Sequence, residues 1–154
     1  MTDVPAREPE PRYQPHPDDP PWLVASVRLH GHLGPWAVLG ARVGQAVLAD
    51  LDCKGYFDVR IEVSGPIAKP PPRCIVDGLQ FATGATLGKG NISAALAETF
   101  EIRATNTKTD QRVRYQLTEQ VLADISDLSG HDKVEALARS LATRPFGQMA
   151  IRSA

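Results

Sequence analysis

Apolar residues recur every three or four positions along several stretches of the chain, which is the pattern of amphipathic helices. The stretches span residues 20–29, 35–50, 74–81, 119–127 and 132–143. Proline opens the first two, and it suits the first turn of a helix because that turn needs no amide donor. Asp18 or Asp19 stands just before the first stretch and is expected to cap it.

Three other stretches alternate apolar and polar residues, as half-buried strands do. The clearest is 56–64, and the other two, 99–106 and 112–117, are separated by five polar residues that favour a hairpin. Helices grouped around a mainly antiparallel sheet predict the α+β class rather than a doubly wound parallel fold.

Proline interrupts the pattern in two places. Seven of the 13 prolines lie in the first 21 residues, and three more form the run 70–72. Because proline suits neither a helix interior nor a central strand, residues 1–18 are expected to form an extended, partly disordered arm before a single core domain at 19–154. Such an arm could also dock on a neighbouring protomer, but termini are usually poorly ordered unless tied down. The second run predicts a stiff loop at 65–73.

Composition narrows the class of protein. The 154 residues carry 17 basic and 18 acidic side chains, a net charge of −1 that argues against a general nucleic-acid binder. No apolar run approaches the roughly 20 residues that span a bilayer, so no membrane partner is expected. The N-terminus lacks the apolar core of a signal peptide, and two cysteines fit a reducing compartment, so we expect a cytoplasmic protein.

His30 and His32 are the first candidates for chemistry. Side chains two positions apart lie on one face of an extended segment, and Gly31 and the Gly34-Pro35 pair favour a non-helical turn here. Neutral imidazole is a common ligand of zinc, iron and copper, and the helix that follows would point its positive end at this turn. Alternatively, one histidine caps the helix and the other is exposed.

Cys74 lies three positions before Asp77, so a helix would place both side chains on one face. In the first turn of a helix the dipole would stabilise a Cys74 thiolate, whereas a buried structural thiol is the common alternative. Asp77 could be a ligand, a base or a helix cap.

The segment from Thr83 to Asn91 combines three glycines, two threonines and a lysine. It departs from the Walker A pattern because Gly84 is one residue too near Gly88-Lys89 and Gly90 stands where serine or threonine is required. Its backbone amides and Lys89 could still hold an anionic group, and a tight turn without a ligand is the alternative.

Three blocks of sequence together resemble the FmdE family, which is named for formylmethanofuran dehydrogenase. They are His30-Gly31-His32-Leu33-Gly34-Pro35 with Gly40 and Arg42, Cys74 to Gln80, and Thr83 to Asn91. The resemblance spans residues 22 to about 115 and implies an α+β core that forms an intertwined homodimer. Some members add a C-terminal zinc finger, but no cysteine follows Cys74, so this chain resembles the core-only form.

The resemblance also implies one pocket to which all three blocks contribute. The metal ligands would be His30, His32 and Cys74, holding a transition metal such as zinc, and the cofactor contacts would be Asp77, Gln80, Thr83, Thr86, Gly88, Lys89 and Asn91. The family usually has cysteine where this chain has Gly34, and often where it has Ala85. Losing these thiols weakens a site for a soft metal.

Three functions are compatible with these residues. The resemblance implies a metal- or cofactor-binding accessory protein linked to one-carbon metabolism. The first alternative is an enzyme acting on a small anionic or pterin-like substrate, with His30 as general base, Cys74 as nucleophile and Lys89 stabilising negative charge. The second is a protein-interaction module with a vestigial pocket, in which residues 119–143 and the N-terminal arm face a partner.

Overall fold

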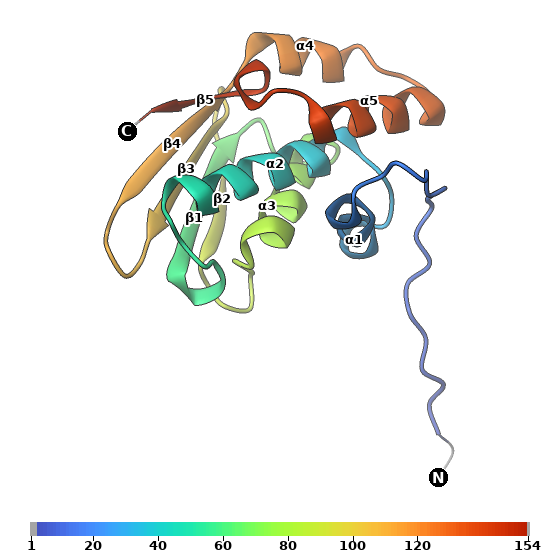
Figure 1. The fold of residues 1–154 in the computed structure, drawn as a ribbon, viewed down its shortest axis with the longest axis horizontal. Coiled ribbons are helices and arrows are strands. Elements are labelled where there is room, and N and C mark those ends of the chain that lie inside the picture. Colours follow the sequence, from blue (N-terminus) through green and yellow to red (C-terminus); the bar gives the residue numbers. More distant parts are fainter. Residues whose placement is uncertain (1–2, 154) are drawn as a thin grey trace.

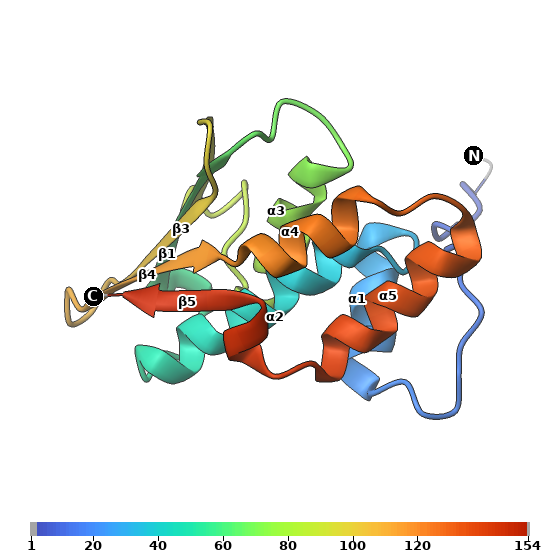
Figure 2. The same ribbon diagram turned by 90° about the horizontal axis from the view of Figure 1, so that it is seen from above.

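Five strands form one sheet in the order β2-β1-β3-β4-β5, and the helices lie against one of its faces (Figures 1 and 2). The computed structural model describes residues 3–153, so the first two residues of the expected arm and the last residue of the core domain lie outside it. The strands are β1 (Val59–Gly65), β2 (Ile92–Leu96), β3 (Glu101–Asn106), β4 (Arg112–Leu117) and β5 (Ala150–Ser153). The helices are α1 (Pro21–His30), α2 (Pro35–Asp50), α3 (Ile75–Thr83), α4 (Glu119–Ser126) and α5 (His131–Thr143).

The sheet is mixed, and the α+β class is confirmed. β1 pairs in parallel with β2, whereas the β1–β3, β3–β4 and β4–β5 pairs are antiparallel. The hairpin of β3 and β4 lies where alternation predicted it. The two edge strands were not predicted, because β2 has no buried residue to set a period and β5 has only four residues.

Two local expectations were wrong. Residues 56–58 form a short 3-10 turn rather than the start of a strand, and Tyr56 has a positive φ of 55° that interrupts an extended chain. Pro20, not an aspartate, occupies the N-cap of α1, and no side chain caps that helix. The Asp19 carboxylate instead accepts hydrogen bonds from Arg139 of α5 and from Tyr13, and a charged donor is a stronger partner than a backbone amide.

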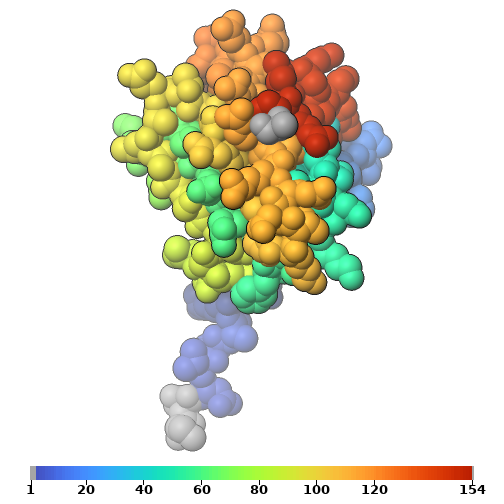
Figure 3. All heavy atoms as spheres, turned by 90° about the vertical axis from the view of Figure 1, so that its left-hand side faces the viewer, coloured from blue at the N-terminus to red at the C-terminus, as the bar shows by residue number. Residues whose placement is uncertain are grey.

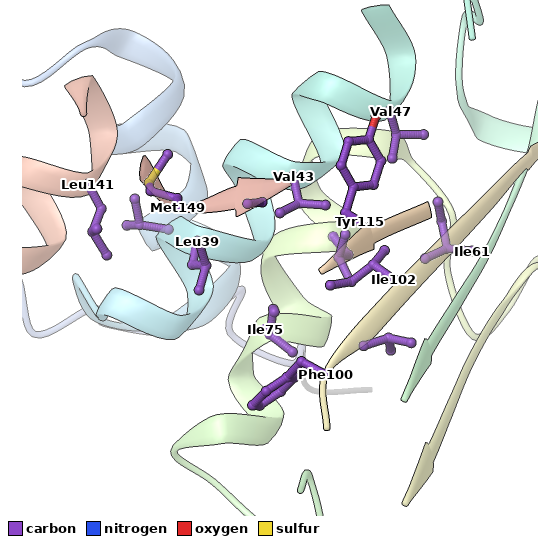
Figure 4. Packing of buried hydrophobic residues seen from close by; sticks show 14 of the residues in the cluster. Leu39, Val43, Val47, Ile61, Ile75, Phe100, Ile102, Tyr115, Leu141 and Met149 are labelled. Atoms are coloured by element: carbon purple, nitrogen blue, oxygen red, sulfur yellow. The ribbon is translucent and has the colours of Figure 1, made fainter. Parts of the chain in front are cut away.

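The hydrophobic core lies between the sheet and α2, the central helix of the fold (Figure 4). Leu39, Val43 and Val47 project from α2 and are fully buried. Their neighbours in the core include Ile61, Ile102 and Tyr115 from the strands, Ile75 from α3, and Leu141 and Met149 from the C-terminal part. Burying one such side chain contributes about 1.5–3 kcal/mol, so α2 is held firmly against the sheet.

α2 and α3 cross so closely that their main chains touch. A Cβ atom added at Gly78 would lie 1.9 Å from the carbonyl oxygen of Ala37, and one added at Gly40 would lie 2.1 Å from that of Ile75. Both distances are far below van der Waals contact, so each position requires glycine. This crossing places the first turn of α3 beside the turn that precedes α2.

The N-terminal arm reaches the body of the protein near its end. Residues 3–10 are exposed and extend beyond the body of the protein (Figure 1), and Glu8 accepts a hydrogen bond from Arg28 of α1 at 2.6 Å. The Arg12 amide then donates to the Gly31 carbonyl at 2.8 Å, and Arg12 forms a parallel bridge with His32. The arm therefore lies against the turn that carries the two histidines. Among residues 3–153, no helix has the length and apolar content needed to cross a bilayer.

Candidate functional site

His30 is the last residue of α1, and His32 lies in the short turn between α1 and α2. Gly31, with a φ of 97°, follows the end of α1 and reverses the chain, and α2 starts at Pro35 as predicted. The two imidazole rings are neighbours, with centroids 4.5 Å apart and planes inclined at 41°. His30 is thus helical rather than part of the extended segment that was expected, and the chain reversal at Gly31 still brings both rings together.

Asp77 holds the His30 ring from α3. Nδ1 of His30 lies 2.7 Å from Oδ2 of Asp77, and the His30 side chain is only 8% exposed, against 42% for Asp77. An ionised carboxylate can only accept a hydrogen bond, so the proton of a neutral His30 resides on Nδ1. Nε2 of His30 then carries a lone pair, which is the form of histidine that binds metals and accepts protons.

Both Nε2 atoms border the same small space beside Gly34. A Cβ atom added at Gly34 would lie 2.8 Å from Nε2 of His32 and 3.7 Å from Nε2 of His30. Burial lowers the pKa of His32, and the neighbouring charges of His30 and His131 lower it further. These surroundings favour the uncharged form of His32, which is the form of histidine that binds metals.

These histidines line a pocket of about 200 Å³. Its other lining residues are Gly34, Pro35, Trp36 and Ala37 from α2 and its start, Pro71 and Cys74, and Ile125, Leu128 and Val134 from α4, α5 and their connection. Most of the exposed lining is apolar, which suits the nonpolar part of an organic ligand. The apolar residues from 125 to 134 were not expected here, because their helical periodicity indicates only burial and not what they face.

Cys74 lines this pocket as a thiol. It occupies the N-cap of α3, but burial raises its pKa, and the Asp77 carboxylate raises it further. The surroundings of Cys74 therefore favour the thiol over the thiolate that the start of the helix was expected to stabilise. Deprotonation of Cys74 would need a bound cation or a base.

The glycine-rich loop forms a separate cluster beyond the other end of α3. Asn91 accepts from the Thr86 amide and donates to the carbonyls of Tyr56 and Val59, while Gln80 accepts from the Leu87 amide. Nζ of Lys89 lies 3.4 Å from the Thr86 hydroxyl and 5.8 Å from the ring centroids of Tyr56 and Phe57. The Thr83 hydroxyl is buried and donates to the Leu79 carbonyl. Within residues 3–153, the predicted cofactor contacts Gln80, Thr83, Thr86, Gly88, Lys89 and Asn91 do not line the histidine pocket.

Comparison with protein families places these residues in context. The sequence profile described as "FmdE, Molybdenum formylmethanofuran dehydrogenase operon" matches residues 29–148, more than three quarters of the chain. The chain belongs to the FmdE family. The match begins at the histidine turn and ends after α5, so it includes every element that lines the pocket. No curated protein matches the chain.

In this FmdE protein, the described residues do not form a complete metal site. Among residues 3–153, no group of three or more His, Cys, Asp and Glu side chains is gathered closely enough to hold a metal ion. Catalytic zinc sites usually have three protein ligands, and structural ones four. His30 and His32 therefore fit two positions, and the remaining donors would come from Cys74 after a movement or from the ligand itself.

The family motif also contains residues that stabilise the fold. Arg42 of α2 donates to the carbonyls of Leu141 and Arg144, where α5 ends. A guanidinium at this position satisfies carbonyl groups that have no partner within the helix. Arg42 thereby fixes α5, and with it one wall of the pocket.

Proposed function

We propose that this FmdE-family chain is a cytoplasmic accessory protein of one-carbon metabolism that binds a metal or cofactor in the pocket at His30 and His32. The observation that carries the proposal is the pair of imidazole Nε2 atoms bordering one space beside Gly34. The description of the family, which names the operon of a molybdenum formylmethanofuran dehydrogenase, supports the metabolic link.

Each residue of the pocket has a distinct part in this proposal. Asp77 fixes the His30 ring and its tautomer, and burial favours the uncharged form of His32, so both rings are ready to act as donors. Cys74 is the third donor, losing its proton to the medium when a cation binds. A transition metal such as zinc would supply a Lewis acid there. Trp36 and the apolar residues of α4 and α5 would contact the nonpolar part of an organic cofactor.

Metal analysis of tag-free protein tests the proposal. After incubation with zinc and removal of the excess, we expect one ion per wild-type chain and a marked loss in His30→Ala and His32→Ala. His16→Ala is the matched control, because His16 is exposed in the N-terminal arm. Equal, substoichiometric metal in all four proteins would refute metal binding at this pocket.

A thermal-shift screen of pterins and nucleotides then tests binding of an organic cofactor. A response to neither class of compound would favour the protein-interaction module.

An enzyme is the second candidate, and the contact between Asp77 and His30 favours it. A carboxylate that holds Nδ1 of a histidine orients the ring and stabilises the imidazolium formed when Nε2 takes a proton. His30 would be the general base, and Cys74, as a thiol, would need this base before it could act as a nucleophile. If His30→Ala and Cys74→Ser kept full turnover on a substrate found by screening, the enzyme proposal would fail.

We also propose that two copies associate through the β2 edge of the sheet. Proteins usually protect an edge strand with charged residues or proline. Residues 92–96 contain neither. By its register, Leu96 lies on the side of the sheet that the helices cover, yet it is 70% exposed. Light scattering should show a dimer for the wild type and a monomer for Leu96→Asp. Leu29→Asp, at an exposed position of α1, should stay dimeric, and a monomeric wild type would refute the proposal.

A further inference from the structure

The face of the sheet opposite the helices is open to solvent (Figure 3). Its strands β1, β3 and β4 carry four exposed arginines. Alternation along β1, β3 and β4 directs one set of residues into the core and the other set outward. The charged residues of the outward set are Arg60, Glu62, Glu101, Arg103, Arg112 and Arg114. We call this surface the arginine face. It carries an excess of two positive charges on a chain whose net charge is −1.

The strand register brings these positive charges together. Arg103 of β3 lies directly opposite Arg114 of β4, and Thr105 of β3 lies between Arg60 and Arg112 on the two flanking strands. Like charges directly opposite one another in a sheet reduce its stability. Arg103 also faces Glu62 of β1 and pairs with Glu101, so its charge is compensated. Arg60, Arg112 and Arg114 have no carboxylate directly opposite them in the sheet.

Three of the four arginines lack a partner within the described chain. Arg103 is paired with Glu101, but Arg60, Arg112 and Arg114 form neither an ion pair nor a side-chain hydrogen bond among residues 3–153. Several arginines outside the face do pair with carboxylates, as in the contacts of Arg139 with Asp19, Arg144 with Asp124 and Arg152 with Asp50. The unpaired guanidiniums surround a hollow of about 640 Å³ in the middle of the face.

We propose that the arginine face binds an acidic stretch of a partner protein. A guanidinium presents its donors as a planar fork that matches a carboxylate, and three free forks in one hollow could each take one side chain. Glu62 and the outward Thr105 would accept and donate hydrogen bonds to the peptide backbone of the same partner. The surface lies on the opposite side of the sheet from the helices that form the histidine pocket, so both could be occupied at once.

The composition of the face favours a protein over a nucleic acid. Proteins that bind single strands combine basic groups with aromatic side chains on which bases stack. None of the outward residues of β1, β3 and β4 is aromatic. Glu62 and Glu101 would also repel a continuous phosphate backbone, whereas an acidic protein segment can place its carboxylates between them.

Fluorescence anisotropy with the full chain tests this proposal. The probes are a labelled oligo-glutamate peptide, an oligo-glutamine peptide of the same length and an oligo-thymidine strand, each at low and moderate salt. We expect the wild type to bind the glutamate peptide in a salt-dependent way and to bind glutamine much more weakly. The double variant Arg112→Glu/Arg114→Glu should weaken binding of the glutamate peptide by on the order of tenfold or more, because two charge-assisted contacts are lost and two repulsions are added.

The control variant changes the net charge by the same amount, at two positions outside the arginine face. Arg7→Glu/Lys133→Glu alters two exposed residues that form no ion pair within residues 3–153 and lie outside the sheet, and it should bind like the wild type. The melting temperature of the arginine-face variant should not fall, since Arg114→Glu puts an opposite charge beside Arg103. Equal binding by both double variants, no preference for glutamate over glutamine, or tighter binding of oligo-thymidine would overturn the proposal.

Discussion

Nδ1 of His30 and Oδ2 of Asp77 meet at 2.7 Å, although 47 positions separate the two residues in the chain. The contact joins the last residue of α1 to the first turn of α3, beside the pocket that His30 lines. Because it determines which nitrogen of His30 carries the proton, it decides what that ring can do.

Replacing Asp77 with asparagine tests this link. The amide is nearly the same size but can present a donor to Nδ1, so it no longer selects one tautomer of His30. We expect the affinity for a ligand held by Nε2 to fall about 10- to 100-fold, with little change in the free energy of unfolding because Asp77 is partly exposed. Calorimetric titration with zinc measures the effect. Asp127→Asn, at an exposed position, is the control, and unchanged affinity in Asp77→Asn would contradict the prediction.

Gly34→Cys restores the thiol that the family resemblance implies at this position. Its Cβ atom would lie 2.8 Å from Nε2 of His32, so that ring has to shift, but its sulfur would become a third donor beside two imidazoles. We expect tighter zinc binding than in the wild type. Gly34→Ala introduces the same Cβ without a thiol and should bind more weakly than the wild type. Equal metal affinity in the two variants would show that the space beside Gly34 is not the binding position.

Gly78→Ala should destabilise the fold. Alanine is the better helix former by about 1 kcal/mol, but its Cβ would lie 1.9 Å from the Ala37 carbonyl oxygen, a contact that only separation of α2 and α3 can relieve. Overpacking of this kind costs about 1–3 kcal/mol and should exceed the gain in helix propensity. Urea unfolding provides the measurement. Gly147→Ala meets no atom within 4 Å and should be neutral, so equal midpoints for the two variants would disprove the close crossing.

Asp19 makes the stability of the protein depend on pH in the acid range. Burial alone would raise its pKa, but hydrogen bonds from Arg139, Tyr13 and the His16 amide outweigh burial and lower the pKa to about 2, against an ordinary value of 3.8. The folded state thus favours the ionised form. This contribution, about 2 kcal/mol, is complete above pH 4 and is lost as the pH falls towards 2.

The variant Asp19→Asn isolates that contribution. Its free energy of unfolding, measured in urea, should be lower than that of the wild type at pH 7, and the difference should shrink between pH 4 and pH 2. Asp18→Asn is the control, because its side chain is 92% exposed. A difference between Asp19→Asn and the wild type that stays constant with pH would exclude a role for the Asp19 charge.

Local sequence patterns were sufficient to predict the helices and the central strands, because each pattern lies within the segment that forms the element. The proline starts of α1 and α2 and the alternation in β1, β3 and β4 are examples. The pairing of β1 with β2 was not predictable in this way, since nothing in Ile92–Leu96 alternates and the pairing depends on a partner some 30 residues away.

The candidate site was predictable only where its residues lie close together in the sequence, because contacts between distant segments leave no local pattern. The rings of His30 and His32 lie side by side in a short segment, but the contact of His30 with Asp77 depends on how α3 packs beside the end of α1. The motif that contains Asp77 continues into the loop with Lys89, yet that loop lies beyond the other end of the helix. Val134, which completes the pocket from α5, looks like any other apolar residue of an amphipathic helix.

At the crossing of α2 and α3, Gly40 and Gly78 each touch the main chain of the opposite helix. This close approach has a consequence for how ligand preference can change among related proteins. Main-chain atoms meet there, so the relative position of α2 and α3 cannot be adjusted by exchanging one apolar side chain for another. The opposite wall, with Ile125, Leu128 and Val134, contributes side chains alone. We therefore expect evolution to alter this second wall and to leave the helix crossing untouched, so relatives with different ligands should differ mainly between α4 and the first turns of α5.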